Sequence, residues 1–318
     1  MLVQAFGYNY VTSQGSMHCL LPPHSHLCTA FPPCSLKKAS SCSAMANITR
    51  SAKLGNHWSM DELLAYNITI QTQSVVDFFG HELRPIDLDP NILSPVTSIP
   101  TGISRPTRRF FNHLILVSHP DAQDSFFNDF ANSVLDVTNF DRQIGTVPVP
   151  RYDFPLTICG NDRKTIPDIC LMSDQLTPMI HLIVQRAKPV FGLRGPEPPV
   201  IAGAIATFQY NNRNRAKVGL PTLDTMTIPC ITVWGTRPLF YKVPVTQHLS
   251  DCVATGQFPT QQTVVTRCGP PDSPEAHEGM KSPEYRRIAL CYYEAFRDLA
   301  EDCWAPFLTG CEGKWPQT

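Results

Sequence analysis

Two short apolar runs near the middle of the chain constrain its fold more than any other feature. Residues 166–172 read IPDICLM, and residues 181–188 read HLIVQRAK. Short apolar runs bounded by turn-forming residues are typical of buried strands. Asp168 lies within the first run, and Lys188 ends the second. A charged residue on each of two neighbouring strands predicts a site where both side chains reach one end of a sheet.

The elements around these runs follow the order helix, three strands, helix, strand. Phenylalanines at helical spacing predict the first helix, a Gly-Asn-Asp cluster ends the first strand, and Gly-Thr-Arg-Pro predicts a hairpin after the last strand. This order indicates an α/β fold with one core. The expected elements are a helix over 121–137, strands over 156–159, 168–172 and 179–185, a helix over 200–210, and strands over 227–234 and 239–245.

Further helices are expected on both sides of this core. Ser59 and Glu62 form a capping box that predicts a short helix. Ser104 begins a helix to about residue 116 with Pro106 in its first turn, and Pro283 begins a last amphipathic helix. The fold class is therefore α/β with extra N-terminal and C-terminal helices.

Residues 1–44 differ from the rest of the chain. They contain four cysteines, two Pro-Pro pairs and no acidic residue, and they show no helical or strand period. Histidines among the cysteines raise a zinc site as an alternative, but the close Cys-x-x-Cys pair of structural zinc sites is missing. We expect a disordered extension, or a gene-model artefact that ends before Met45, then one domain over 45–310 and a frayed tail over 311–318.

Composition narrows the class of protein. The formal net charge of −1 and the pI of about 6.8 give no global basic field for nucleic acid, although a local groove can suffice. No apolar run is long enough for a transmembrane helix, and the N-terminus lacks the pattern of a signal peptide. Several of the 12 cysteines fall inside expected strands or helices, which favours reduced thiols and a cytoplasmic or nuclear location.

Asp168 and Lys188 are the candidate catalytic residues. Metal-dependent cleavage of a phosphodiester needs carboxylates that hold Mg²⁺ and a cation that stabilises the developing negative charge. Residues two apart on a strand share a face, so the second carboxylate should stand two residues before Lys188. Arg186 occupies that position, and a guanidinium cannot bind Mg²⁺. Of the two positions where a carboxylate is expected, only Asp168 carries one, so it is the candidate metal ligand. Mg²⁺ is expected only if the protein is active.

Other groups offer alternatives at this site. Gln185 carries an amide oxygen but is expected on the opposite strand face from Arg186. A displaced carboxylate from a loop would come from Asp162, Asp174 or Glu197, each of which also reads as a solvated turn residue. Asp168 itself also reads as one half of a structural ion pair with Arg186 or Lys188.

Five segments resemble an uncharacterised family of mushroom-forming fungi that is related to the PD-(D/E)XK, or restriction-endonuclease-like, nucleases. The segments are NHWSMDELLAYNI (56–68), LTICGNDRK (156–164), FQYNNR (208–213), MTIPCIT (226–232) and SPEYRR (282–287). The resemblance covers about 46–308 and implies the helix, three strands, helix, strand core of those nucleases. Asp168 and Lys188 match the family pattern, whereas Arg186 and Ala187 stand where the family has Glu and Asp.

A polar, basic segment follows the helix over 200–210. Gln209, Arg213, Arg215 and Lys217 are candidate contacts to nucleic acid phosphates. Basic residues at a helix C-terminus also complement the helix dipole without any ligand. Arg105, Arg108 and Arg109 form a second basic patch, which also fits a solvated helix face.

Three functions remain open. The first is a nuclease-like protein with a degenerate metal site, which is noncatalytic or impaired and acts in a nucleic-acid-related or scaffold role. The second is an active Mg²⁺-dependent nuclease with a displaced carboxylate, and the third is a protein-interaction module without a nucleic-acid role. The neighbours of Asp168 in the structure separate the first two.

Overall fold

The structure, a computed structural model, describes residues 50–85, 87–140, 146–173, 178–186 and 195–308. The chain divides into two units, Met1–Ser40 and Ser41–Thr318, and every described residue belongs to the second. The expected extension over 1–44, the expected tail over 311–318 and Lys188 lie outside the described residues. The expectations for these parts of the chain therefore stay predictions.

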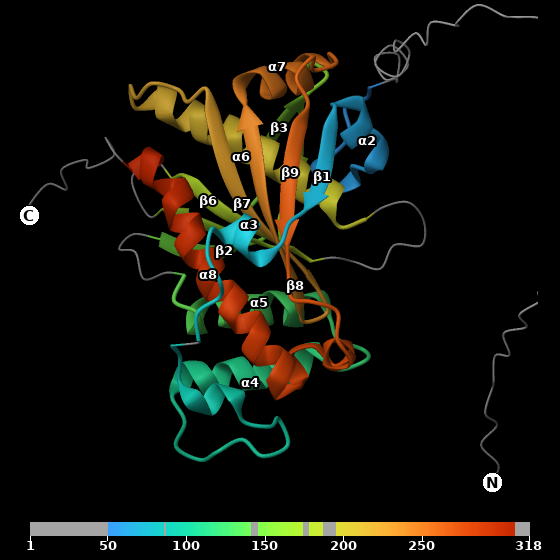
Figure 1. The fold of residues 1–318 in the computed structure, drawn as a ribbon. Helices are drawn as coiled ribbons and strands as arrows, with labels where there is room; N and C mark the ends of the chain where they lie inside the picture. The colour runs from blue at the N-terminus through green and yellow to red at the C-terminus, as the bar shows by residue number, and fades with distance from the viewer. Residues whose placement is uncertain (1–49, 86, 141–145, 174–177, 187–194, 309–318) are drawn as a thin grey trace, which may run out of the picture. The chain divides into compact units, whose positions relative to one another are not determined.

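A seven-stranded mixed sheet forms the centre of the second unit (Figure 1). β6 and β7 run parallel, as do β1 and β9, and all other neighbours in this sheet are antiparallel. A separate hairpin consists of β3 (Phe154–Ile158) and β4 (Asn161–Thr165). Across the sheet, the order is β1 (Ile68–Thr72), β9 (Thr263–Cys268), β8 (Arg237–Thr246), β7 (Thr225–Trp234), β6 (Ile180–Arg186), β5 (Ile169–Ser173) and β2 (Thr146–Pro150).

The central strands are buried on both faces, which explains their continuous apolar runs. All five residues of β5 are buried. Ile169 and Leu171 pack into one hydrophobic cluster, whereas Cys170 and Met172 pack into the other. This alternation follows from the two-residue period of a strand and gives every β5 residue a defined face. Burial of each large apolar side chain contributes about 1.5–3 kcal/mol to stability.

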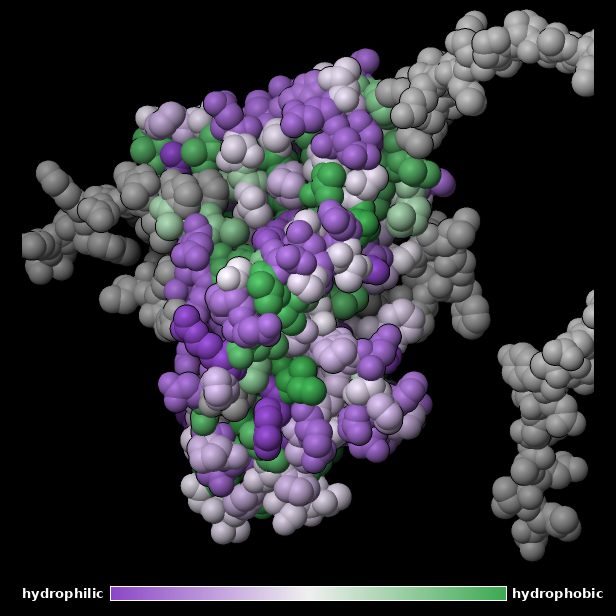
Figure 2. All heavy atoms as spheres, in the orientation of Figure 1, coloured by the Kyte–Doolittle hydropathy of each residue, from purple (hydrophilic) through white to green (hydrophobic). Residues whose placement is uncertain are grey.

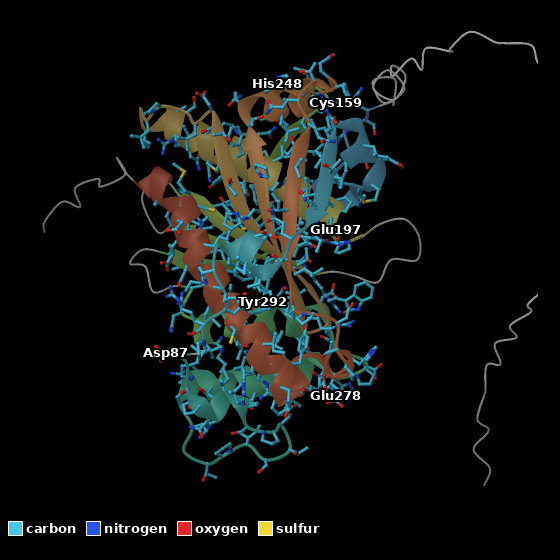
Figure 3. All side chains as sticks on the ribbon, in the orientation of Figure 1. Asp87, Cys159, Glu197, His248, Glu278 and Tyr292 are labelled. Atoms are coloured by element: carbon cyan, nitrogen blue, oxygen red, sulfur yellow. The ribbon has the colours of Figure 1, made fainter. Side chains whose placement is uncertain are left out.

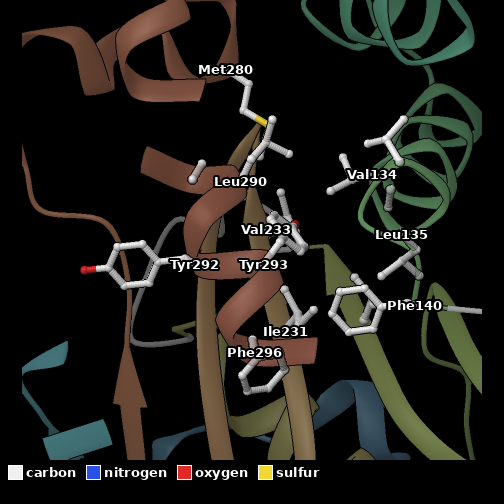
Figure 4. Packing of buried hydrophobic residues seen from close by; sticks show 14 of the residues in the cluster. Val134, Leu135, Phe140, Ile231, Val233, Met280, Leu290, Tyr292, Tyr293 and Phe296 are labelled. Carbon is white, nitrogen blue, oxygen red and sulfur yellow. The ribbon is translucent and has the colours of Figure 1, made fainter. Parts of the chain in front are cut away.

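Four helices and three short 3-10 helices contribute to the cluster on one face, part of which is shown in Figure 4. In Figure 1, α8 and α3 cross in front of the sheet, and α5 contacts β5. We call this side the α5 face. Its elements are α3 (Val75–Phe79), α4 (Arg105–Val117), α5 (Asp124–Val137), α8 (Pro283–Leu308), η2 (Pro90–Leu93), η3 (Pro274–His277) and η4 (Gly279–Lys281).

The opposite side, the α6 face, is covered by three helices and the β3–β4 hairpin. α6 (Glu197–Lys217) connects β6 to β7 and packs on both strands. A Cβ atom on Gly203 would lie 2.7 Å from Cδ1 of Ile183, so glycine permits the close approach of this helix to the sheet. The other elements here are η1 (Gly55–His57), α2 (Met60–Ala65) and α7 (Gln247–Thr255).

Most of the expected helices are confirmed. Ser59 and Glu62 form the capping box of α2, and Ser104 caps α4, which begins at Arg105. α6 extends beyond the expected 200–210 at both ends, and α5 begins three residues later than expected. The hairpin of β7 and β8 is also confirmed, with Trp234 paired to Arg237 across its turn.

The first of the three expected strands is corrected. Residues 156–158 belong to β3, which pairs only with β4, and the strand that pairs with β5 is β2. β2 contains Pro148 and Pro150 and lies at the edge of the sheet, where proline is tolerated because its missing N–H is not needed by a neighbour. The described order is α5, β2, β3, β4, β5, β6, α6, β7, and it matches the expected helix, three strands, helix, strand only when β2 replaces the strand expected over 156–159 and the β3–β4 hairpin is set aside.

Within the described residues, no helix is long and apolar enough to cross a membrane. Figure 2 shows one side of the molecule, on which hydrophobic residues are interspersed with hydrophilic ones. The seven cysteines of the described residues form no disulfide.

Candidate metal site between strands β5 and β6

Asp168 lies at the end of the sheet where β5 begins and β6 ends. Ile169 pairs with Val184 in the antiparallel register of these strands, which places Asp168 opposite Gln185. The Oδ2 atom of Asp168 accepts a hydrogen bond from Nε2 of Gln185 at 2.8 Å and another from the backbone N–H of Arg186 at 2.6 Å. One carboxylate oxygen is thus bound by two donors of β6, which fixes the two strands to each other.

The segment before Asp168 is held from the side of α6. Asn56 in η1 donates from Nδ2 to the carbonyl oxygen of Ile166 at 3.2 Å. A Cβ atom on Gly203 would be 4.0 Å from the Pro167 ring, so α6 passes close to this turn. The backbone N–H of Arg151 donates to the carbonyl of Asp168 at 2.9 Å. These contacts fix the backbone at and before Asp168, and so they position its carboxylate.

Arg186 does not share a face with Asp168, contrary to the sequence-based expectation. Its guanidinium bonds the carboxylate of Asp124 at the start of α5 and lies 5.7 Å from the ring centre of Phe127. The reason is the register: cross-strand partners share a face, so Gln185 lies beside Asp168, and Arg186 is turned to the α5 face. The structure therefore does not form the alternative ion pair between the Arg186 guanidinium and Asp168.

The proposed replacement carboxylates are engaged elsewhere. Asp162 accepts a hydrogen bond from the Thr157 hydroxyl in the exposed β3–β4 hairpin at 2.7 Å. Glu197, at the start of α6 beside the sheet in Figure 3, pairs with Arg267 of β9 at 2.5 Å and is 8% exposed. Asp174 lies outside the described residues.

Glu197 and Arg267 belong to a polar layer on the α6 face. Arg267 also donates to the Thr72 hydroxyl of β1 at 3.0 Å, so the ion pair joins α6 to two strands. Burial, and next the charge of Glu197, raise the pKa of Tyr241, whose hydroxyl lies 3.2 Å from that of Thr232. Thr232 pairs with Gln185 across β6 and β7, so this polar layer continues to the candidate site.

These residues do not fit a magnesium ion. Mg²⁺ requires several oxygen ligands in near-octahedral geometry, and its protein ligands are mainly carboxylates. Here the side chain opposite Asp168 is a neutral amide whose N–H donates to the carboxylate, so β6 brings no second carboxylate to this position. Across the described ranges, no group of three His, Cys, Asp or Glu side chains has a geometry that could hold a metal.

Of the four residues of α6 that were expected to contact nucleic acid, three bond neighbouring parts of the fold and one is exposed. Gln209 bonds the backbone N–H and carbonyl of Thr157 at 2.8 and 3.1 Å, as a neighbouring strand would. Arg213 donates to the Pro155 carbonyl at 3.1 Å, and buried Arg215 donates to the Pro221 carbonyl at 2.8 Å. Lys217 is exposed and contacts Asn214 at 3.2 Å. Three of the four therefore hold α6 to its neighbours.

Three further residues reach the β5–β6 end of the sheet, and the sequence pattern assigns none of them a contact there. They are Gln185, Asn56 and Asp124. The signal that could have found Gln185 is the cross-strand register, which the sequence pattern alone does not fix. No protein-family model matches the chain, and the search of curated proteins gives no match either.

Proposed function

We propose that this chain is a noncatalytic protein with a PD-(D/E)XK-like core that acts by binding, as a scaffold, and does not cleave phosphodiesters. The order α5, β2, β5, β6, α6, β7 supports the core, because apart from the β3–β4 hairpin between β2 and β5 it is the helix, three strands, helix, strand order of that fold. The antiparallel β5–β6 pair and the parallel β6–β7 pair joined by α6 are compatible with it.

One observation carries the proposal. Asp168 faces an amide, Gln185, and not a second carboxylate, and two donors of β6 reach its Oδ2 atom. A carboxylate bound in this way stabilises the strand pair as a charge-assisted hydrogen-bond acceptor. A metal ion at Oδ2 would compete with these donors, and it would find no second acid on β6 within the described residues.

We assign the binding role to protein partners more than to nucleic acid. Gln209, Arg213 and Arg215 use their polar groups within the fold, and the whole chain carries a net charge of −1. Specific nucleic-acid binding usually requires a basic surface free to reach phosphates. We retain the cytoplasm or nucleus as the proposed location, because the cysteines of β5 and β7 are fully buried as small apolar side chains.

The test is cleavage of plasmid and single-stranded DNA with Mg²⁺ or Mn²⁺ by the unaltered chain and by Asp168→Ala. We expect no cleavage above background from either protein. Robust cleavage by the unaltered chain that Asp168→Ala abolishes would show that a displaced acid completes the site, and the proposal would be wrong.

A second variant tests whether the site lacks only a second carboxylate or is not a nuclease-like metal site at all. Gln185→Glu places a carboxylate directly opposite Asp168, so it supplies the group that the site lacks. If it gains weak metal-dependent cleavage, that cleavage should disappear in Gln185→Glu combined with Asp168→Ala. Cleavage that persists in the double variant would come from another site and would contradict the assignment of this one.

A further inference from the structure

A cavity of about 320 Å³ lies between α4, α5 and the strands β2 and β5, on the α5 face of the sheet. Small-molecule pockets usually occupy about 300–1,000 Å³, so its volume is at the lower end of that range. Leu135, Phe140 and Leu171 give it an apolar wall. Leu135 and Phe140 are labelled in Figure 4, where they lie beside the sheet.

The same cavity is lined by two opposite charges that do not meet. Arg109 extends from the exposed side of α4, and Asp136 from the C-terminal half of α5. Neither side chain forms an ion pair or a hydrogen bond with the described residues. Elsewhere in the fold, comparable groups pair directly, as Glu197 does with Arg267. Both charges therefore line the cavity without an ion-pair partner among the described residues.

A polar atom without a partner also faces this region. Oδ1 of Asn132, another lining residue, is buried and has no hydrogen-bond partner among the described residues. Two more buried atoms, Nδ1 of His113 on α4 and Oδ1 of Asn128 on α5, lack partners among the described residues, but neither residue lines the cavity. Buried polar atoms are nearly always hydrogen-bonded in folded proteins, so such a group needs a ligand or an ordered water to satisfy it.

The lining specifies the chemistry of a ligand. Asp136 and Oδ1 of Asn132 can accept hydrogen bonds, so they require a group with several N–H donors. The Arg109 guanidinium can only donate, and it binds carboxylates well. The apolar wall requires a hydrocarbon part between or beside these two ends.

We propose that this cavity binds a small zwitterion with an apolar body, of which the apolar α-amino acids are the simplest example. The ammonium group would lie at Asp136 and Asn132, the carboxylate at Arg109, and the side chain along Leu135 and Phe140. The inference does not depend on the proposed function, because it uses no residue of the Asp168 site.

The test is calorimetric titration of the full chain with L-phenylalanine and with two analogues that each lack one charge. 3-Phenylpropanoate has no ammonium group, and 2-phenylethylamine has no carboxylate. We expect saturable binding of L-phenylalanine and at least about tenfold weaker binding of each analogue, which is the effect of losing one charge-assisted hydrogen bond.

Two substitutions test which residue binds the carboxylate of the ligand and which binds its ammonium group. Arg109→Gln should weaken L-phenylalanine about tenfold and leave 2-phenylethylamine unchanged, whereas Asp136→Asn should weaken L-phenylalanine and leave 3-phenylpropanoate unchanged. Arg108→Gln on α4 and Asp129→Asn on α5 are matched controls, because both residues are exposed and lie outside the cavity lining. Thermal unfolding without ligand checks that each variant is folded.

Several results would overturn the inference. They are no saturable binding of L-phenylalanine by the unaltered chain, equal affinity for all three compounds, or the same loss in the control variants as in Arg109→Gln and Asp136→Asn. The comparison of the three compounds uses the unaltered chain, so it remains decisive even if a substitution unfolds the protein.

Discussion

The two faces of the sheet differ in how they satisfy their buried amide side chains. On the α6 face, Asn211 bonds both the backbone N–H and the carbonyl of Ile180, at 2.9 and 2.8 Å. Gln209 bonds β3 in the same two-sided way. On α5, in contrast, Oδ1 of Asn128 and Oδ1 of Asn132 are buried and without a partner among the described residues.

This difference separates structural polar residues from residues that are available to a ligand. Burial of a polar group is unfavourable unless a hydrogen bond compensates for the lost water. The amides of α6 obtain that compensation from backbone groups, so they fix the helix to the sheet. The amides of α5 do not, and one of them, Asn132, lines the cavity of the proposed further site, whereas the basic segment of α6 is assigned to the fold.

The largest effect is expected from Asn211→Ala. The substitution leaves the N–H and the carbonyl of Ile180 without their partner, and each unsatisfied buried group costs about 1–3 kcal/mol. The free energy of unfolding should fall by about 2–5 kcal/mol, measured by urea denaturation. The exposed Asn112→Ala on α4 is the control and should change it by less than about 0.5 kcal/mol. Equal effects of the two substitutions would show that the α6 amides are not structural.

An intermediate effect is expected at His181, a buried residue at the bulge where β6 shifts its register against β5. Its Nε2 atom lacks a partner in the described part of the chain, its ring packs on Trp304, and burial lowers its pKa to about 4. The histidine of the unfolded chain has a pKa of about 6.5. The unfolded chain therefore binds more protons between these values, and stability falls as the pH is lowered from about 6.5 to 4.

His181→Phe keeps an aromatic ring on Trp304 and removes the titration. The slope of unfolding free energy against pH in that window should decrease by up to about 1.4 kcal/mol per pH unit, the limit for one proton. Urea denaturation of both proteins at several pH values measures it. An unchanged slope would mean that His181 titrates normally in the folded protein.

The smallest effect is expected from Asn128→Leu on α5. Since Oδ1 of Asn128 bonds no described residue, an apolar side chain of similar size loses little, and the unfolding free energy should change by less than about 1 kcal/mol. A loss as large as that of Asn211→Ala would show that this amide is satisfied, and the contrast between the two faces would disappear.

Local signals predicted where the two capped helices α2 and α4 begin, although not the bounds of α5 and α6. Ser59 with Glu62 and Ser104 with Pro106 each begin a helix where expected, because a cap is satisfied within a few residues of chain. The β7–β8 hairpin was predictable for the same reason. β2 was not, since Pro148 and Pro150 are compatible with a strand only at an edge, and edge position is a property of the whole sheet.

The location of the candidate site in the sheet was predictable from the sequence. Which β6 side chain lies beside Asp168 was not. The apolar runs placed Asp168 and the end of β6 at one end of the sheet, as found. Which β6 side chain faces Asp168 depends on the register between two strands, and a shift of one residue exchanges Gln185 for Arg186. That choice is set by tertiary packing, including the contact of Arg186 with Asp124 and Phe127 on α5.

The central claim is that Asp168 faces Gln185 and not Arg186, and titration of two single variants with Mn²⁺ tests it most directly. Gln185→Glu should create a metal site by placing two carboxylates opposite each other, and its binding heat should vanish when Asp168→Ala is added. Any Mn²⁺ binding by Arg186→Glu should be unaffected when Asp168→Ala is added, because its carboxylate would lie beside Asp124 on the α5 face and away from Asp168. Asp168-dependent Mn²⁺ binding by Arg186→Glu, with none by Gln185→Glu, would contradict the account.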